Sequence, residues 1–129
     1  MERKMKVLLV EDNILNQKVA MFSLNKLNLD VDIANNGLEA VDKFKVNSYD
    51  LVIMDIMMPL MDGLEATVEI RKFEKNENRV DLVPIIALTA NTLDNDREKC
   101  IEHGMNEYME KPFNITKFQM ILRQMELKV

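Results

Sequence analysis

Two hydrophobic periods alternate along the chain. Short apolar runs of four to six residues are followed by longer stretches in which apolar residues recur every three to four positions, and the pair of patterns repeats five times. Short runs predict β-strands, and the longer period predicts helices. The expected strands are residues 6–10, 30–34, 50–54, 83–88 and 106–109. The chain therefore reads as five consecutive βα units.

The expected helices differ in how much apolar surface they offer to a core. Four have an apolar stripe at helical spacing, whereas the helix over residues 93–103 has a thin one among many charges, which predicts weak packing and a helix able to move. Gly104 is placed at the C-terminal end of that helix and Asn114 at the start of the last one. The stripes, in chain order, are Leu15, Val19 and Phe22; Leu38, Val41 and Phe44; Ala66, Ile70 and Phe73; Leu93, Cys100 and Ile101; and Ile115, Phe118, Leu122 and Met125.

Strict alternation of strand and helix predicts a parallel sheet, because each right-handed crossover carries a helix across one face. Residues 7–10, 51–54 and 85–88 are apolar without interruption, as central strands buried on both faces require. Residues 30–33 alternate and residues 107–109 are short and polar, which suits edge strands. The expected fold class is α/β, a five-stranded parallel sheet in the flavodoxin-like order 2-1-3-4-5 with helices on both faces.

Size and charge narrow the class of protein. The 129 residues suit one domain spanning 1–129, and the composition of 47% hydrophobic and 30% charged residues is that of a globular protein. A net charge of −5 opposes nucleic-acid binding by this chain alone. The apolar runs are too short to cross a membrane, and Cys100 is the only cysteine, so no internal disulfide is expected. We expect a cytoplasmic protein.

Polar residues follow four of the five strands. Glu11 and Asp12 follow the first and Asp55 the third, while Thr89 and Lys111 follow the fourth and fifth. Singly, each is explained equally well as a cap, a turn residue or a solvated side chain. Together they converge where ligands bind in such sheets, beyond the carboxyl ends of the strands. Three clustered carboxylates repel one another unless a cation is present, which predicts a Mg²⁺ site.

Four motifs at these strand ends resemble the response-regulator receiver family. They are VEDN at 10–13, MDIMMP at 54–59, LTA at 88–90 and EKP at 110–112, with a DG dipeptide in the expected loop at 62–63. Segments 11–17 and 57–66 are most similar to receiver domains of hybrid sensor histidine kinases. The resemblance spans nearly the whole chain and implies the doubly wound fold predicted above.

The resemblance also implies roles at the acidic cluster. Asp55 would be the phosphoacceptor, because a carboxylate in line with a phosphohistidine can attack phosphorus. Mg²⁺ would be held by Asp12, Asp55 and the backbone carbonyl of Met57, with Glu11 acting mainly through water. Met57 and Asn91 occupy positions that tune water access in the family, and an apolar Met57 is expected to slow hydrolysis of the phosphoryl group.

The remaining implied roles concern phosphoryl binding and switching. Lys111 would place a positive charge on a phosphoryl oxygen, and the Thr89 hydroxyl and Ala90 backbone N–H would donate to others. Tyr108 occupies the position of the family's switch aromatic, and Pro112 that of its cis peptide. The output face would be the fourth helix, fifth strand and fifth helix.

The resulting hypothesis is a phosphorelay receiver that takes its phosphoryl group from a sensor histidine kinase or a histidine phosphotransfer protein. It would catalyse its own phosphotransfer and autodephosphorylation without being a stand-alone enzyme in the usual sense. The alternative is a pseudo-receiver scaffold that signals without phosphorylation. His103 falls at a helix end, which indicates a structural or solvated side chain rather than a histidine phosphodonor. Met57 stands where aspartyl phosphatases commonly have a second acid, so a phosphatase would lack its general acid. A phosphorylation-dependent dimer, and the choice between a stand-alone regulator and part of a hybrid kinase, stay open.

Overall fold

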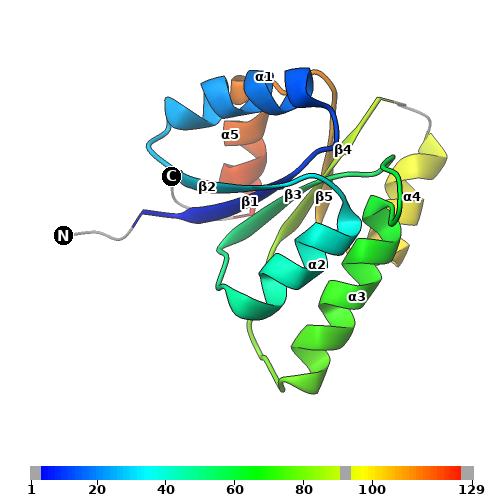
Figure 1. The fold of residues 1–129 in the computed structure, drawn as a ribbon. Helices are drawn as coiled ribbons and strands as arrows, with labels where there is room; N and C mark the ends of the chain where they lie inside the picture. The colour runs from blue at the N-terminus through cyan, green and yellow to red at the C-terminus, as the bar shows by residue number, and fades with distance from the viewer. Residues whose placement is uncertain (1–3, 91–93, 126–129) are drawn as a thin grey trace.

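Five βα units form the structure, a computed structural model that describes residues 4–90 and 94–125. The five strands make one parallel sheet in the order β2-β1-β3-β4-β5, which confirms the predicted fold class (Figure 1). Their bounds, with those of the helices, are β1 Lys6–Val10, α1 Ile14–Asn25, β2 Asp30–Ala34, α2 Gly37–Val46, β3 Leu51–Asp55, α3 Gly63–Asn76, β4 Ile85–Thr89, α4 Asp94–Glu102, β5 Glu107–Glu110 and α5 Ile115–Gln124.

Helices cover both faces of the sheet, with α1 and α5 on one side and α2, α3 and α4 on the other (Figure 1). Alternate residues of each central strand serve the two layers, so that Val7 and Leu9 pack toward α1 and α5 while Leu8 and Val10 pack toward α2 and α3. This double burial explains why the central strands read as uninterrupted apolar runs. Within the described ranges, no helix is long and apolar enough to cross a bilayer.

Three strands are displaced from their predicted bounds: β3, β4 and β5 each end one residue later than expected, β3 and β5 also begin one residue later, and β4 begins two residues later. β4 begins at Ile85 rather than residue 83, because the Val83 N–H donates to Glu74 Oε2 at 2.7 Å and Pro84 has no N–H to donate. β3 runs one residue further, so Asp55 is its last residue, as Thr89 is the last of β4. Both side chains are thus fixed by strand backbone rather than by a loop.

The prediction that Leu15, Val19 and Phe22 form the buried stripe of α1 is wrong. Leu15, Val19 and Phe22 are 70%, 40% and 67% exposed, and the residues that α1 buries are Gln17, Ala20 and Leu24. Both sets have helical spacing, and the helix turns the set with the small Ala20 toward the sheet, where a close approach is possible. Leu38 of α2 and Ile101 of α4 are also exposed. Leu93, predicted for the fourth stripe, lies outside the described residues.

Helix ends follow the sequence signals. Gly104 ends α4 with φ of 108°, and the Asn114 side chain caps α5 by accepting from the Lys117 N–H, so both predictions are confirmed. α4 itself packs mainly against β5. Among its residues from Arg97 onward, Cys100 is buried and Ile101 is half exposed, consistent with the thin stripe expected from the sequence.

A buried ion pair fastens α3 to the α4–β5 loop. Glu74 is fully buried, and its Oε1 lies 2.7 Å from Arg71 Nη1. Arg71 also donates from Nε and Nη2 to the Gly104 carbonyl, at 3.0 and 2.8 Å, and from Nη2 to Asn106 Oδ1 at 3.0 Å. The second Glu74 oxygen accepts from Val83 as described above. One guanidinium therefore joins a helix, a loop and the residue before β5.

Candidate functional site

Three carboxylates meet at the carboxyl edge of the sheet. Glu11 and Asp12 follow β1, Asp55 ends β3, and each offers one oxygen so that the three atoms lie within 4.8 Å of one another. Glu11 and Asp55 are buried, at 1% and 2% exposure, whereas Asp12 is exposed. β1 and β3 are adjacent in the sheet, so the topology alone brings these residues together as the sequence predicted.

Lys111, the residue that follows β5, completes the cluster. Its Nζ lies 2.8 Å from Asp55 Oδ2 and 3.0 Å from Glu11 Oε1. The backbone holds the residue in place, because the Lys111 N–H donates to the Thr89 carbonyl at 2.8 Å. The Lys111–Pro112 peptide bond is cis, as the resemblance implied. One ammonium thus bridges two buried carboxylates.

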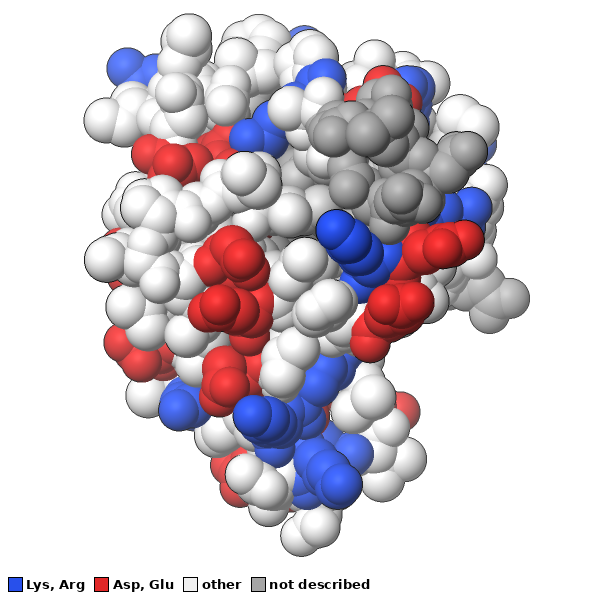
Figure 2. All heavy atoms as spheres, turned by 90° about the vertical axis from the view of Figure 1, so that its right-hand side faces the viewer, with Lys and Arg blue, Asp and Glu red and all other residues white. Residues whose placement is uncertain are grey.

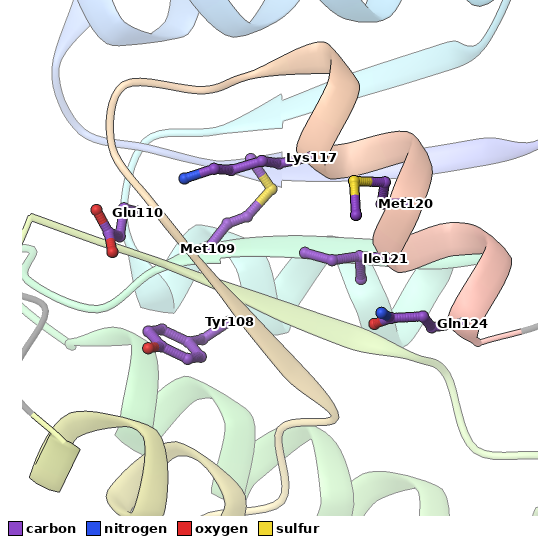
Figure 3. A pocket seen from close by; sticks show the side chains of 7 residues that line it. All are labelled: Tyr108, Met109, Glu110, Lys117, Met120, Ile121 and Gln124. Atoms are coloured by element: carbon purple, nitrogen blue, oxygen red, sulfur yellow. The ribbon is translucent and has the colours of Figure 1, made fainter.

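The other residues singled out from the sequence lie around this cluster. Thr89 is buried at the end of β4 and Ala90 follows it in an exposed position. The Met57 N–H lies 3.3 Å from Asp55 Oδ1, while the Met57 side chain is 78% exposed. Tyr108 of β5 is half-buried, with the Arg97 guanidinium 6.0 Å from its ring centroid, and lies beside α4 (Figure 3). Asn91 lies outside the described residues.

Two glycines pin the loop between β3 and α3. The Gly63 N–H donates to the Ile56 carbonyl at 2.8 Å, and the Gly37 N–H of α2 donates to the Met61 carbonyl at 3.1 Å. A Cβ at Gly63 would collide with the Asp55 carbonyl, and one at Gly37 with the Met61 carbonyl. Only glycine permits these backbone contacts, so the loop that follows Asp55 is fixed by its main chain.

The two buried carboxyls share a proton-binding environment. Burial raises the pKa of Asp55 to about 7, and its hydrogen bond with Glu11 adds to this shift, while Lys111 opposes it. Burial also raises the pKa of Glu11, but hydrogen bonds with Asp55 and Lys111 outweigh it and leave that pKa below its ordinary value. Asp55 is therefore only partly ionised near neutral pH, and a cation bound at the cluster would favour its ionised form.

The donor set fits a hard divalent cation. Glu11 Oε1 is buried and accepts no hydrogen bond from the described residues, although Lys111 Nζ ion-pairs with it. Three carboxylates face a single lysine, and all the side-chain donors are oxygens, which suits Mg²⁺ better than zinc. Charged side chains of both signs lie on the face toward which the strand ends point, and neither sign covers it (Figure 2).

Gln17 is a site residue that the sequence interpretation missed. Its Nε2 donates to the Glu11 carbonyl at 2.6 Å and to Asn35 Oδ1 at 2.8 Å. The signal was present in the sequence, because Gln17 has helical spacing with Ala20 and Leu24. A polar residue within such a stripe marks a buried hydrogen-bonding position.

The sheet order, with an acidic cluster at its switch point, defines a flavodoxin-like α/β domain. Residues 7–123 match the family model described as response regulator receiver domain, and the chain belongs to this family. The chain is 42% identical over 113 residues to hybrid signal transduction histidine kinase K of Dictyostelium discoideum. That match covers 85% of this chain but only 9% of the relative, so the chain spans a small part of that protein.

Solved receiver domains have the same fold. The receiver domain of sensor histidine kinase PA1611 from Pseudomonas aeruginosa PAO1, with a magnesium ion in its active site cleft, is 43% identical with a TM-score of 0.82, over 95% of this chain and 97% of that one. The receiver domain of the Saccharomyces cerevisiae response regulator Ssk1, in a co-crystal with the histidine phosphotransfer protein Ypd1, is 33% identical with a TM-score of 0.88, covering 100% and 95%. These similarities agree with the fold and the acidic site described above.

Proposed function

We propose that this receiver domain accepts a phosphoryl group on Asp55 from a phosphohistidine of a two-component partner. The observation that carries the proposal is the buried Asp55 carboxylate, held 2.8 Å from Lys111 Nζ and clustered with two further carboxylates. In the transfer, an Asp55 carboxylate oxygen forms a bond to phosphorus while the phosphorus–nitrogen bond to imidazole breaks, and the imidazole leaves with the bonding electron pair.

Different site residues would stabilise the negative charge of the acceptor and of the phosphoryl group. Glu11, Asp12, Asp55 and the Met57 carbonyl would hold Mg²⁺, which when bound offsets negative charge on the acceptor and the phosphoryl oxygens. Asp55 must be ionised to attack, and a cation bound at the cluster would favour that state. Lys111 keeps a positive charge beside the acceptor, and the Thr89 hydroxyl and Ala90 N–H would donate to phosphoryl oxygens.

An exposed apolar surface supports a protein rather than a small molecule as the phosphodonor. It begins two residues beyond Asp12 and follows one side of α1, and the loop after Asp55 adds two more apolar side chains. Exposed apolar patches of this kind mark protein interaction sites. A sensor histidine kinase or a histidine phosphotransfer protein would bind here. The residues of this surface are Ile14, Leu15, Val19, Phe22, Met57 and Leu60.

The proposed output is a change on the face formed by α4, β5 and α5. The ion pair between α4 and β5 is a weak contact, since Arg97 and Glu107 lie 3.8 Å apart with side chains 55% and 26% exposed. A new phosphoryl group on Asp55 would attract the Thr89 hydroxyl and the Lys111 ammonium, and their movement would shift α4. A groove of about 220 Å³ between β5 and α5, with Met109 among its lining residues, lies on the same face (Figure 3).

The direct test is incubation with Mg²⁺ and acetyl phosphate, followed by mapping of the labile adduct by mass spectrometry. We expect the label on Asp55, its loss in Asp55→Asn, and unchanged labelling in Asp42→Asn, which removes an exposed acid of α2. Equal labelling of Asp55→Asn contradicts the assignment. Mg²⁺-dependent binding of beryllofluoride separates the phosphorylation switch from the pseudo-receiver scaffold, which predicts no spectroscopic response. The single-domain organisation of 1–129, the cytoplasmic location and a phosphorylation-dependent dimer stay predictions.

A further inference from the structure

A buried amide lies where α1 packs against the sheet. Gln17 is 9% exposed and precedes Ala20 and Leu24 on the buried side of the helix. Burying an amide there is unfavourable unless its polar atoms are bonded, and an apolar side chain of similar size would fill the same space. The hydrogen bonds of Gln17 therefore explain the residue better than its packing does.

Both hydrogens of this amide hold loops at the carboxyl edge of the sheet. Gln17 Nε2 donates to the Glu11 carbonyl at 2.6 Å, in the loop after β1, and to Asn35 Oδ1 at 2.8 Å, in the loop after β2. Asn35 Nδ2 in turn lies 3.2 Å from Glu39 Oε1 of α2. Gln17 thus connects the loop that carries Glu11 and Asp12 to the loop after β2, which Asn35 joins in turn to α2.

The bond to Glu11 acts on the peptide group that joins the two acids. The Glu11 carbonyl and the Asp12 N–H belong to one planar peptide unit. Gln17 donates to the oxygen of that unit, and the Asp12 N–H of the same unit donates to Glu11 Oε2 at 3.1 Å. The orientation of the Glu11 carboxylate and the starting point of the Asp12 side chain are therefore both set by a plane that Gln17 fixes.

We propose that Gln17 is a positioning residue for the metal site, which orients Glu11 and Asp12 for a divalent cation without touching it. The inference rests on the proposed function in that it requires Mg²⁺ to bind at these carboxylates. Residues that orient metal ligands from behind have measurable effects on affinity, and their loss weakens metal binding roughly 10-fold to 100-fold.

The test is a Mg²⁺ titration of the whole chain, followed by the backbone amide NMR shifts of Asp12 and Asp55. Gln17→Met keeps the volume and the helix propensity of the side chain but removes both donors. We expect the Mg²⁺ dissociation constant to rise roughly 10-fold or more in this variant. Asn35→Ala, a change at an exposed position, removes one acceptor of Gln17 and should raise the constant by a smaller factor.

Leu24→Val is the matched control, because Leu24 is buried on the same side of α1 but lies two turns beyond Gln17, further from the acidic loop. It should lower the melting temperature and leave the Mg²⁺ constant unchanged. Unchanged affinity in Gln17→Met, or an equal loss in Leu24→Val, overturns the inference. If Gln17→Met does not fold, unchanged affinity in Asn35→Ala overturns it. A wild-type chain without a saturable Mg²⁺ response refutes the metal site itself and the inference with it.

Discussion

Replacing Arg71 with methionine should unfold the protein at a much lower denaturant concentration. Glu74 is fully buried, and the variant would leave its carboxylate with the Val83 N–H at 2.7 Å but without the guanidinium at 2.7 Å. Removing one partner of a buried pair typically costs about 3 to 5 kcal/mol, because the remaining charge is uncompensated. Domains of this kind are stable by only about 5 to 15 kcal/mol, so the loss is a large fraction of the total.

The assay is urea unfolding followed by circular dichroism at neutral pH, with Lys72→Met as the matched control. Lys72 is one residue along the same helix and pairs with Glu69 at 3.4 Å, but its side chain is 65% exposed, so its loss should change stability by about 0 to 1 kcal/mol. Adding Glu74→Gln to Arg71→Met should recover part of the loss, because no charge is then left unpaired. If Arg71→Met is no more destabilising than Lys72→Met, the carboxylate is not held by this pair and the reasoning fails.

Three further predictions concern the site and its surroundings. Without Mg²⁺, the pKa of Asp55 lies at about 7, against 3.8 ordinarily, so the native state binds more protons than the unfolded state between these pH values. The contribution of Asp55 therefore makes the unfolding free energy fall as pH rises through this window. Urea titrations at several pH values should show a weaker fall in Asp55→Asn. Met57→Asn should shorten the phosphoryl lifetime measured by loss of label, since a polar side chain admits water, whereas Leu60→Asn, equally exposed in the same loop, should not; equal lifetimes for wild type and Met57→Asn contradict this role. Phe22→Glu should slow transfer from a phosphorylated histidine phosphotransfer protein in stopped-flow assays while leaving acetyl phosphate labelling unchanged, and slower labelling by both donors would place the defect in the chemistry instead.

The sheet and the site follow from the sequence for the same reason. Apolar runs locate strands, uninterrupted runs locate central strands, and parallel strands bring their carboxyl ends to one edge. The proximity of Glu11, Asp55 and Lys111 can therefore be predicted without any knowledge of side-chain contacts. A rule that acts on whole elements is enough to predict them.

Other features escape such rules because they depend on individual contacts. α1 has two stripes with helical spacing, and periodicity alone cannot tell which one packs on the sheet; Phe22 belongs to the exposed one and Gln17 to the buried one. The contact between Arg71 and Gly104 joins residues 33 positions apart, through a loop whose path no pattern encodes. The start of β4 shifts because a carboxylate of α3 takes the Val83 N–H.

The glycine-pinned loop after Asp55 has a consequence for how such domains diverge and can be redesigned. Its course is set by main-chain contacts of Gly63 and Gly37, whereas Met57 and Leu60 project from it with 78% of their surface exposed. Side chains at these two positions can be exchanged without moving the acceptor carboxylate. At Leu60 a new side chain would therefore alter the surface offered to a partner without altering the chemistry, whereas at Met57 it would also change the phosphoryl lifetime, so a library restricted to Leu60 would rewire the connections of the domain while retaining its chemistry.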